Sequence, residues 1–241
     1  MPPTVIGHRG AAAYAPENTL EGIREAHRRG ARWVEFDAKL TGDGEVVLLH
    51  DDTLDRTTNG HGPVAVATLA ALQGLDAGGW FGPAWRGARV PTLARTLALL
   101  LELDMQANVE IKPCPGRDEA TALAVVDVVG RSWPSDRAPP LLSSFSRQSL
   151  AAAQSVAPEL PRGLLVWRHP EDWAAAAKDL ACVSLHCAHQ HLTASWARQI
   201  RALGLALAVY TLNDGARARE LMGWGVQSII TDQPDTILAA V

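Results

Sequence analysis

The sequence predicts one domain with the (β/α)8 barrel fold, and three observations lead to this prediction. Eight apolar runs of β-type residues alternate with segments of helical length, so the repeating unit is a strand followed by a helix. No linker or shift in composition divides the chain, and 241 residues are enough to bury one large core. Eight such units close into a barrel with the helices outside.

The expected strands are short runs rich in Val, Ile, Leu and aromatic residues, bounded by turn-forming residues. In chain order they cover residues 4–8, 33–37, 109–112, 141–145, 163–167, 182–186, 205–211 and 226–232. The expected helices cover residues 18–29, 91–104, 118–131, 146–156, 170–179, 193–203, 214–223 and 234–240. Because each strand leads into a helix, we expect neighbouring strands to run parallel.

A ninth apolar run, 45–50, follows the second expected strand too closely to be part of a parallel crossover. The turn pair Asp43-Gly44 lies between the two runs. We therefore expect an antiparallel hairpin arm that leaves the mouth of the barrel after Asp37 and brings His50 back to it.

Residues 51–89 take the place of the helix expected after the second strand. This segment is rich in glycine and has few strong patterns, as in Thr57-Thr58-Asn59-Gly60 and Gly78-Gly79. We interpret it as a small insertion over the barrel mouth. The chain is thus predicted to be a single barrel domain, 1–241, with one insertion.

Composition and charge exclude several classes of function. The 22 basic and 26 acidic residues leave a net charge of −4 without a basic block, so a small molecule is favoured over duplex nucleic acid as partner. The chain lacks an apolar run of about 18 residues and a secretory signal, so we expect no membrane span. Three cysteines without a disulfide spacing predict free thiols and a cytoplasmic location. Nothing in the sequence predicts the oligomeric state.

Charged and imidazole side chains stand where apolar residues are expected. In a barrel of this type the carboxyl ends of the strands carry the chemistry, while interior strand positions are normally Val, Ile or Leu. Here the ends of three strands and of the hairpin carry His8, Arg9, Glu35, Asp37, His50, Asp51, Glu110 and Lys112. We expect all of these residues to meet at one mouth.

Three carboxylates of this set predict a metal site. The two-residue period of a strand places Glu35 and Asp37 on one face, and Glu110 and Lys112 on one face of another strand. Burying three carboxylates together is unfavourable unless their pKa values rise or a divalent cation neutralises them. Ligands that are all oxygen favour Mg²⁺ or Ca²⁺, with Mn²⁺ also compatible, over zinc. The alternative is a structural ion-pair network with Arg9 and Lys112.

The charge of the expected site points to a phosphodiester. A divalent cation, Arg9 and Lys112 together exceed the three carboxylates by one positive charge, which a phosphodiester monoanion balances. His8 and His50 are the groups at the mouth that exchange a proton near neutral pH, and diester cleavage needs both a base and an acid. The sequence does not decide which histidine has which role.

The chain resembles the glycerophosphodiester phosphodiesterases. The resemblance covers essentially the whole chain, and it rests on nine short strings in the order and spacing of the family. They are His8-Arg9-Gly10, Pro16-Glu17-Asn18-Thr19, Glu35-Phe36-Asp37, His50-Asp51, the stretch from Leu75-Asp76-Ala77-Gly78 to Phe81, Pro91-Thr92-Leu93, Glu110-Ile111-Lys112, Ser144-Phe145 and Thr231-Asp232.

The resemblance implies metal-dependent hydrolysis of glycerophosphodiesters, such as glycerophosphocholine or glycerophosphoethanolamine, to glycerol 3-phosphate and an alcohol. It implies a metal site formed by Glu35, Asp37 and Glu110. It also implies that His8 and His50 are the acid–base pair, and that Arg9 and Lys112 contact the phosphate. It also implies that the alcohol or glycerol pocket is lined by Trp80, Phe145 and Tyr210. The family usually has Trp where this chain has Tyr210, which leaves the preferred headgroup open. Two alternatives are a lysophospholipase D-type enzyme and a non-catalytic barrel that binds phosphorylated metabolites.

Supporting roles are predicted for two further acids. Glu17 is either a partner of the site or an acid at the start of the first helix, and Asp51 either orients His50 or caps a turn. His186 is a candidate substrate contact at the end of its strand. The cysteines and histidines near it do not have the spacing of a zinc site. The other tryptophans, Trp167 among them, are assigned to packing.

Overall fold

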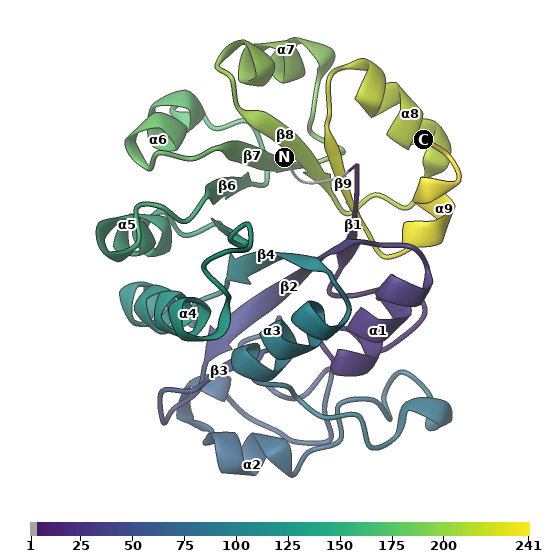
Figure 1. The fold of residues 1–241 in the computed structure, drawn as a ribbon, viewed down its shortest axis with the longest axis vertical. Coiled ribbons are helices and arrows are strands. Elements are labelled where there is room, and N and C mark those ends of the chain that lie inside the picture. The colour runs from purple at the N-terminus through teal and green to yellow at the C-terminus, as the bar shows by residue number, and fades with distance from the viewer. Residues whose placement is uncertain (1–3) are drawn as a thin grey trace.

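Eight parallel strands close into a barrel in the computed structural model, which describes residues 4–241 (Figure 1). Hydrogen-bonded neighbours follow the order β1-β9-β8-β7-β6-β5-β4-β2, and pairing of β1 with β2 completes the ring. The strands are β1 (Val5–His8), β2 (Trp33–Leu40), β4 (Gln106–Ile111), β5 (Leu141–Ser144), β6 (Arg162–Val166), β7 (Ser184–Ala188), β8 (Ala206–Tyr210) and β9 (Ser228–Thr231). The predicted barrel is therefore confirmed.

Helices surround the barrel, one after each parallel strand (Figure 1). Five of them begin at a Ser, Thr or Asp whose side chain accepts a hydrogen bond from the first turn, which satisfies backbone donors that the helix leaves free. The helices are α1 (Leu20–Arg28), α3 (Leu93–Glu102), α4 (Asp118–Ser132), α5 (Arg147–Val156), α6 (Trp173–Asp179), α7 (Ala194–Ala202), α8 (Gly215–Gly223) and α9 (Pro234–Leu238). Their buried faces pack on the outside of the strands and form two large apolar clusters.

The predicted hairpin is also present. Strand β3 (Val46–Leu48) pairs antiparallel with the second half of β2, with Leu48 opposite Ala38. Gly44 in the connecting turn has a φ of 89°, a conformation that glycine adopts without strain. Because the hairpin continues β2 to Leu40, this strand is longer than the apolar run alone suggests.

The insertion packs beside the hairpin. It was predicted to cover the mouth of the barrel, and it does not. It contains the short helix α2 (Leu69–Gln73) and the 3-10 turns Val64–Val66 and Pro83–Trp85. Its apolar side chains form a third cluster with the hairpin residues Val47 and Leu49. In Figure 1 it lies below β3 and α3, outside the barrel. An exposed hairpin face needs apolar cover, which explains this position, and only the first residues of the insertion reach the mouth.

Several strands carry buried polar side chains. Buried Asn108, Ser143, Ser184, His186 and Ser228 replace the branched apolar residues that usually fill such a barrel. Of these residues, Asn108 lines the cavity at the mouth. Among the described residues, no helix is long and apolar enough to span a membrane.

Candidate active site

The register of strands β2 and β4 brings the predicted carboxylates together. In the pairing of β2 with β4, Asp37 lies opposite Glu110, and Glu35 lies two residues before Asp37 on the same face. One oxygen from each of these carboxylates lies within 4.8 Å of the others. The exposed fractions of Glu35, Asp37 and Glu110 are only 3%, 1% and 7%. The predicted acidic centre is therefore formed, and it could hold a divalent metal ion.

Burial and mutual repulsion determine how this centre holds protons. Burial, and then the charges of Asp37 and Glu110, hold the pKa of Glu35 well above its usual range. Burial and then the charge of Asp37 raise the pKa of Glu110 to about 7, against the opposite effect of Lys112. Burial would also raise the pKa of Asp37, but Arg9 and Lys112 together hold it well below its usual range.

The donor set fits a hard divalent cation. The raised pKa values of Glu35 and Glu110 reflect burial and the mutual repulsion of the three carboxylates, and a bound divalent cation would relieve the same repulsion. The Oε1 atom of Glu35 is buried and has no hydrogen-bond partner within the chain, and an orphaned buried oxygen of this kind needs a ligand. Carboxylate oxygens are the ligands preferred by Mg²⁺, Ca²⁺ and Mn²⁺.

Two cations flank the carboxylates. Arg9 forms an ion pair with Glu17 at 2.7 Å and lies 3.3 Å from Asp37. Lys112 lies 2.8 Å from Glu110 and 3.3 Å from Asp37. Arg9 has a φ of 50°, in the left-handed region that is unfavourable for arginine, and such strain is found where a site requires it. The ion pairs with the carboxylates leave both cations at the rim of the centre, partly exposed.

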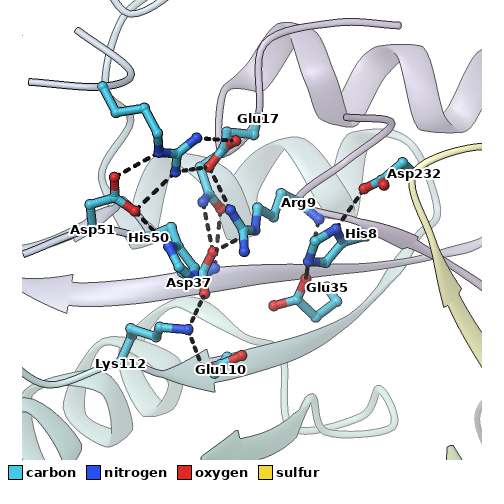
Figure 2. Close-up of polar contacts among 12 residues, drawn as sticks. His8, Arg9, Glu17, Glu35, Asp37, His50, Asp51, Glu110, Lys112 and Asp232 are labelled. Atoms are coloured by element: carbon cyan, nitrogen blue, oxygen red, sulfur yellow. Dashed lines mark hydrogen bonds and ion pairs between the residues drawn. The ribbon is translucent and has the colours of Figure 1, made fainter. Parts of the chain in front are cut away.

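Each predicted histidine is hydrogen-bonded to an aspartate through Nδ1 (Figure 2). The His8 Nδ1 atom lies 2.6 Å from Asp232, and its Nε2 atom lies 3.9 Å from Glu35. The His50 Nδ1 atom lies 2.7 Å from Asp51. With Nδ1 engaged in this way, Nε2 is the atom left free to exchange a proton.

The burial of His50 favours its neutral form. Burial and then the neighbouring cations Arg9 and Lys112 lower the pKa of His50, although Asp37 and Asp51 act in the opposite direction. A neutral imidazole accepts a proton, as a general base must.

Several residues of the site were missed by sequence reasoning. Asp232 accepts a hydrogen bond from the Asn213 amide at 2.8 Å, and Asn18 donates to Asp37 at 2.8 Å. Asp232 follows the last strand directly, so the strand-end rule could have found it. Asn18 and Arg56, whose guanidinium donates to Asp51 and Glu17, lie outside the strands, so the strand-end rule does not reach them.

One cavity of about 210 Å³ lies at the mouth over these groups. Two of the three aromatic residues predicted to line it do so: Phe145 and Tyr210, whose rings form an edge-to-face pair with centroids 5.9 Å apart. A second cavity of about 450 Å³ adjoins it. The two cavities share His50, Glu110, Lys112 and Phe145.

Trp80 does not line either cavity, so its predicted place in the pocket is wrong. Its indole donates a hydrogen bond to the Ala77 carbonyl, and its ring packs edge-to-face on Phe81 within the insertion. Trp80 lies away from the cavity because the insertion packs beside the hairpin. Trp167, which was assigned to packing, takes this place: it follows β6, lines the first cavity and is 54% exposed.

The cysteines and the histidines near His186 form no metal site. Within residues 4–241 the one group with metal-ligand geometry is the carboxylate centre. The three cysteines are free, as expected, and the structure buries all three. His186 is fully buried and does not line the cavities, so its predicted substrate contact is also wrong. It hydrogen-bonds Ser184 at 2.9 Å and packs so closely on Gly163 that a Cβ there would lie 2.8 Å from its Nε2 atom.

The burial of His186 predicts an acid-sensitive fold. Burial lowers the pKa of His186 to about 4, against about 6.5 in the unfolded chain. Between these pH values the unfolded chain binds a proton that the folded chain does not, so the free energy of unfolding falls as the pH falls through this window. Between pH 7 and pH 5 we expect the free energy of unfolding of wild type to fall by about 2 kcal/mol more than that of His186→Asn, as measured by urea unfolding. Equal losses in the two proteins would contradict this.

The position of these groups defines the class of protein. Barrel enzymes hold their reacting groups at the carboxyl ends of the strands. This chain places buried carboxylates, aspartate-bound histidines and two cations at that end, around one cavity. It is an enzyme of the (β/α)8 barrel class.

Comparison with known proteins identifies the family. The model of the glycerophosphoryl diester phosphodiesterase family matches residues 8–236. The chain therefore belongs to this family. It is 34% identical over 246 residues to a glycerophosphodiester phosphodiesterase of Caldanaerobacter subterraneus, covering 100% of this chain and 98% of that protein. It is 33% identical to a glycerophosphodiester phosphodiesterase of Bacillus subtilis, covering 95% of this chain and 83% of that protein.

Solved structures share the fold. A phosphodiesterase of Oleispira antarctica, in complex with the product sn-glycerol-3-phosphate, superposes with a TM-score of 0.96 at 38% identity. The match covers 99% of this chain and 96% of that one. A glycerophosphodiester phosphodiesterase from Agrobacterium tumefaciens has a TM-score of 0.77 at 30% identity, with 99% and 100% covered.

Proposed function

We propose that this enzyme hydrolyses glycerophosphodiesters, such as glycerophosphocholine or glycerophosphoethanolamine, to glycerol 3-phosphate and the free alcohol. The observation that carries this proposal is the buried carboxylate centre with an aspartate-bound histidine and a cation on either side, around one cavity. The Oleispira antarctica relative was solved with sn-glycerol-3-phosphate, which is the product expected from this reaction.

Binding of the phosphodiester anion falls to Arg9 and Lys112. Both cations lie at the rim of the centre, where a phosphate oxygen can replace part of their contact with the carboxylates. Glu35, Asp37 and Glu110 would hold a divalent cation, Mg²⁺ or Ca²⁺ with Mn²⁺ also compatible. When bound, such a cation supplies Lewis-acid polarisation of a phosphate oxygen. As negative charge develops on the phosphate, the two side-chain cations stabilise it.

Proton transfer falls to the Nε2 atoms of His8 and His50. Asp232 and Asp51 accept from the Nδ1–H groups and fix the tautomer that leaves Nε2 free to accept or donate. One histidine takes the proton from the attacking hydroxyl, and the other protonates the leaving alcohol. The attacking group is either water or the glycerol 2-hydroxyl, and the second route passes through a cyclic phosphate.

One observation supports an alternative substrate. Phe145 and Trp167 are 44% and 54% exposed beside the cavity, and a groove over the end of β6 continues from them. An acyl chain could lie on this apolar surface, as a lysophospholipase D-type enzyme requires. The lining of the cavity does not include Trp80 or Phe81, so these rings offer an acyl chain no apolar surface there. A non-catalytic binder is not favoured, because the carboxylates, histidines and cations are all in place.

A comparison of kcat/KM for two substrates tests the proposal. We expect kcat/KM for glycerophosphocholine to exceed that for lysophosphatidylcholine at least about 10-fold, because the cavity has room for a glycerol but is ringed by charged groups. Choline release from each substrate, below the critical micelle concentration of the lipid, measures both values. A preference for the lipid would replace the proposed substrate, and no release from either would reject a diesterase acting on these compounds.

A further inference from the structure

Arg56 lies outside the proposed catalytic set, in the first part of the insertion. Its guanidinium donates four hydrogen bonds, two to each of two carboxylates, Asp51 and Glu17. We propose that Arg56 is a positioning residue, which fixes a catalytic histidine and a phosphate-binding arginine relative to each other. This inference rests on the proposed function for the roles of His50 and Arg9.

We call Arg56 with its two carboxylate partners, Asp51 and Glu17, the clamp, and each carboxylate is one arm of it. The first arm, Asp51, leads to His50. Arg56 Nε donates to Asp51 Oδ2 at 2.7 Å, and Nη2 donates to Asp51 Oδ1 at 3.0 Å. The same Oδ1 atom lies 2.7 Å from the Nδ1 atom of His50. The Asp51 side chain is about one quarter exposed, so without Arg56 water would compete for its oxygens and other rotamers would become accessible. The fork of Arg56 therefore determines where the His50 ring points.

The second arm leads to Arg9. Arg56 Nη1 and Nη2 donate to the two oxygens of Glu17, each at 2.8 Å. The Oε1 atom of Glu17 also accepts from Arg9 Nη1 at 2.7 Å. Glu17 is therefore shared by two guanidinium groups. Arg9, in turn, forms an ion pair with Asp37. Figure 2 shows Glu17 and Asp51 on the same side of the site, with Arg9 and His50 between them and Asp37.

A planar guanidinium is needed to join the two arms. Its donors lie in one rigid plane, so they can bind two carboxylates at a fixed angle, whereas a lysine ammonium acts as a point charge. The segment around Arg56 is itself held, because Thr58 donates from its backbone N–H and its hydroxyl to the Leu54 carbonyl. Leu54, Thr57 and Thr58 are buried. The clamp is thus built on an ordered turn.

The other histidine is held in a different way. Beside His8, the carboxylate of Asp232 accepts a hydrogen bond from the neutral amide of Asn213 at 2.8 Å. Asn213 and Asp232 follow the neighbouring strands β8 and β9, so His8 is positioned by the barrel itself. His50 stands at the end of the hairpin, outside the ring of parallel strands, and obtains its support from Arg56. This difference explains why only one of the two histidines needs an arginine.

Steady-state kinetics of Arg56→Ala test the proposal. We expect kcat for glycerophosphocholine to fall about 10- to 100-fold and KM to rise severalfold, because one arm orients the proton-transfer group and the other the phosphate contact. Arg56→Lys should recover only part of this loss. Arg89→Ala is the control: Arg89 donates to the carbonyls of Gly74 and Leu75 within the insertion and has no contact with the site, so we expect values within twofold of wild type.

A double variant tests whether Arg56 acts through Asp51. If it does, Arg56→Ala combined with Asp51→Asn should lose no more kcat than the more damaging single variant does, whereas independent effects would multiply. Values for Arg56→Ala within twofold of wild type would overturn the proposal, and so would multiplying losses or an equal loss in Arg89→Ala. If Arg56→Ala does not fold, Arg56→Lys and Arg56→Gln are used in the same comparison.

The ¹⁵N resonances of the His50 ring separate this proposal from the proposed function. At pH 8, wild type should show Nδ1 protonated and Nε2 free, and Arg56→Ala should show a mixture of both tautomers. This result requires no turnover, so it decides on the clamp even if the enzyme fails to cleave glycerophosphocholine. An unchanged tautomer in the variant would overturn the positioning role.

Discussion

Glu35→Gln is expected to lower kcat/KM for glycerophosphocholine by at least about 1,000-fold, because it removes one of the three anionic oxygens that hold the divalent cation. The side chain keeps its size, so no cavity is created. Burial, and then repulsion from Asp37 and Glu110, already raise the pKa of Glu35. A neutral amide at this position should therefore leave the melting temperature of the metal-free protein at or above that of wild type.

A second buried glutamate provides the matched control for this variant. Glu25 is buried in α1, is paired with Arg28 and Arg29, and does not line the cavity. Glu25→Gln should lower the melting temperature while keeping kcat/KM within twofold of wild type, the reverse of the result for Glu35→Gln. A melting temperature of metal-free Glu35→Gln several degrees below that of wild type would show that Glu35 is structural.

His8→Asn and His50→Asn are each expected to lower kcat by about 100- to 10,000-fold, the usual contribution of a group that transfers a proton in the transition state. KM should change less, because the phosphate contacts of Arg9 and Lys112 remain. His61→Asn is the control, since His61 lies in the insertion with an 84% exposed side chain and pairs only with Asp55. Either site variant retaining more than a tenth of the wild-type kcat would exclude that histidine from proton transfer.

The alternation of apolar runs and helical segments was enough to predict the barrel, because each strand and each helix carries its own periodicity. The strand boundaries were less certain. Strand β4 begins at Gln106, although the predicted run began at 109, because Asn108 faces the polar interior and interrupts the apolar pattern. Strand β7 lies two residues later than the predicted run, and Val183, which opened that run with Cys182, is half exposed.

The site could be predicted where it depends on strand ends. The eight residues chosen on this rule meet at the mouth, since parallel strands deliver their carboxyl ends to one edge. Residues supplied by loops could not be found in this way. Arg56 reaches the site from the insertion, and Trp80 and Trp167 exchanged their expected roles, because the packing of a loop segment depends on distant contacts that no local pattern records.

Phosphorus NMR of glycerophosphocholine incubated with the protein tests the central claim most directly. With Mg²⁺ or Ca²⁺ present, we expect the diester resonance to be replaced by that of glycerol 3-phosphate, and a chelator should abolish the change. A transient cyclic phosphate resonance would identify the glycerol 2-hydroxyl as the attacking group. Folded protein that forms no glycerol 3-phosphate with either cation, or that forms it equally fast with the chelator present, would contradict metal-dependent diester hydrolysis at this site.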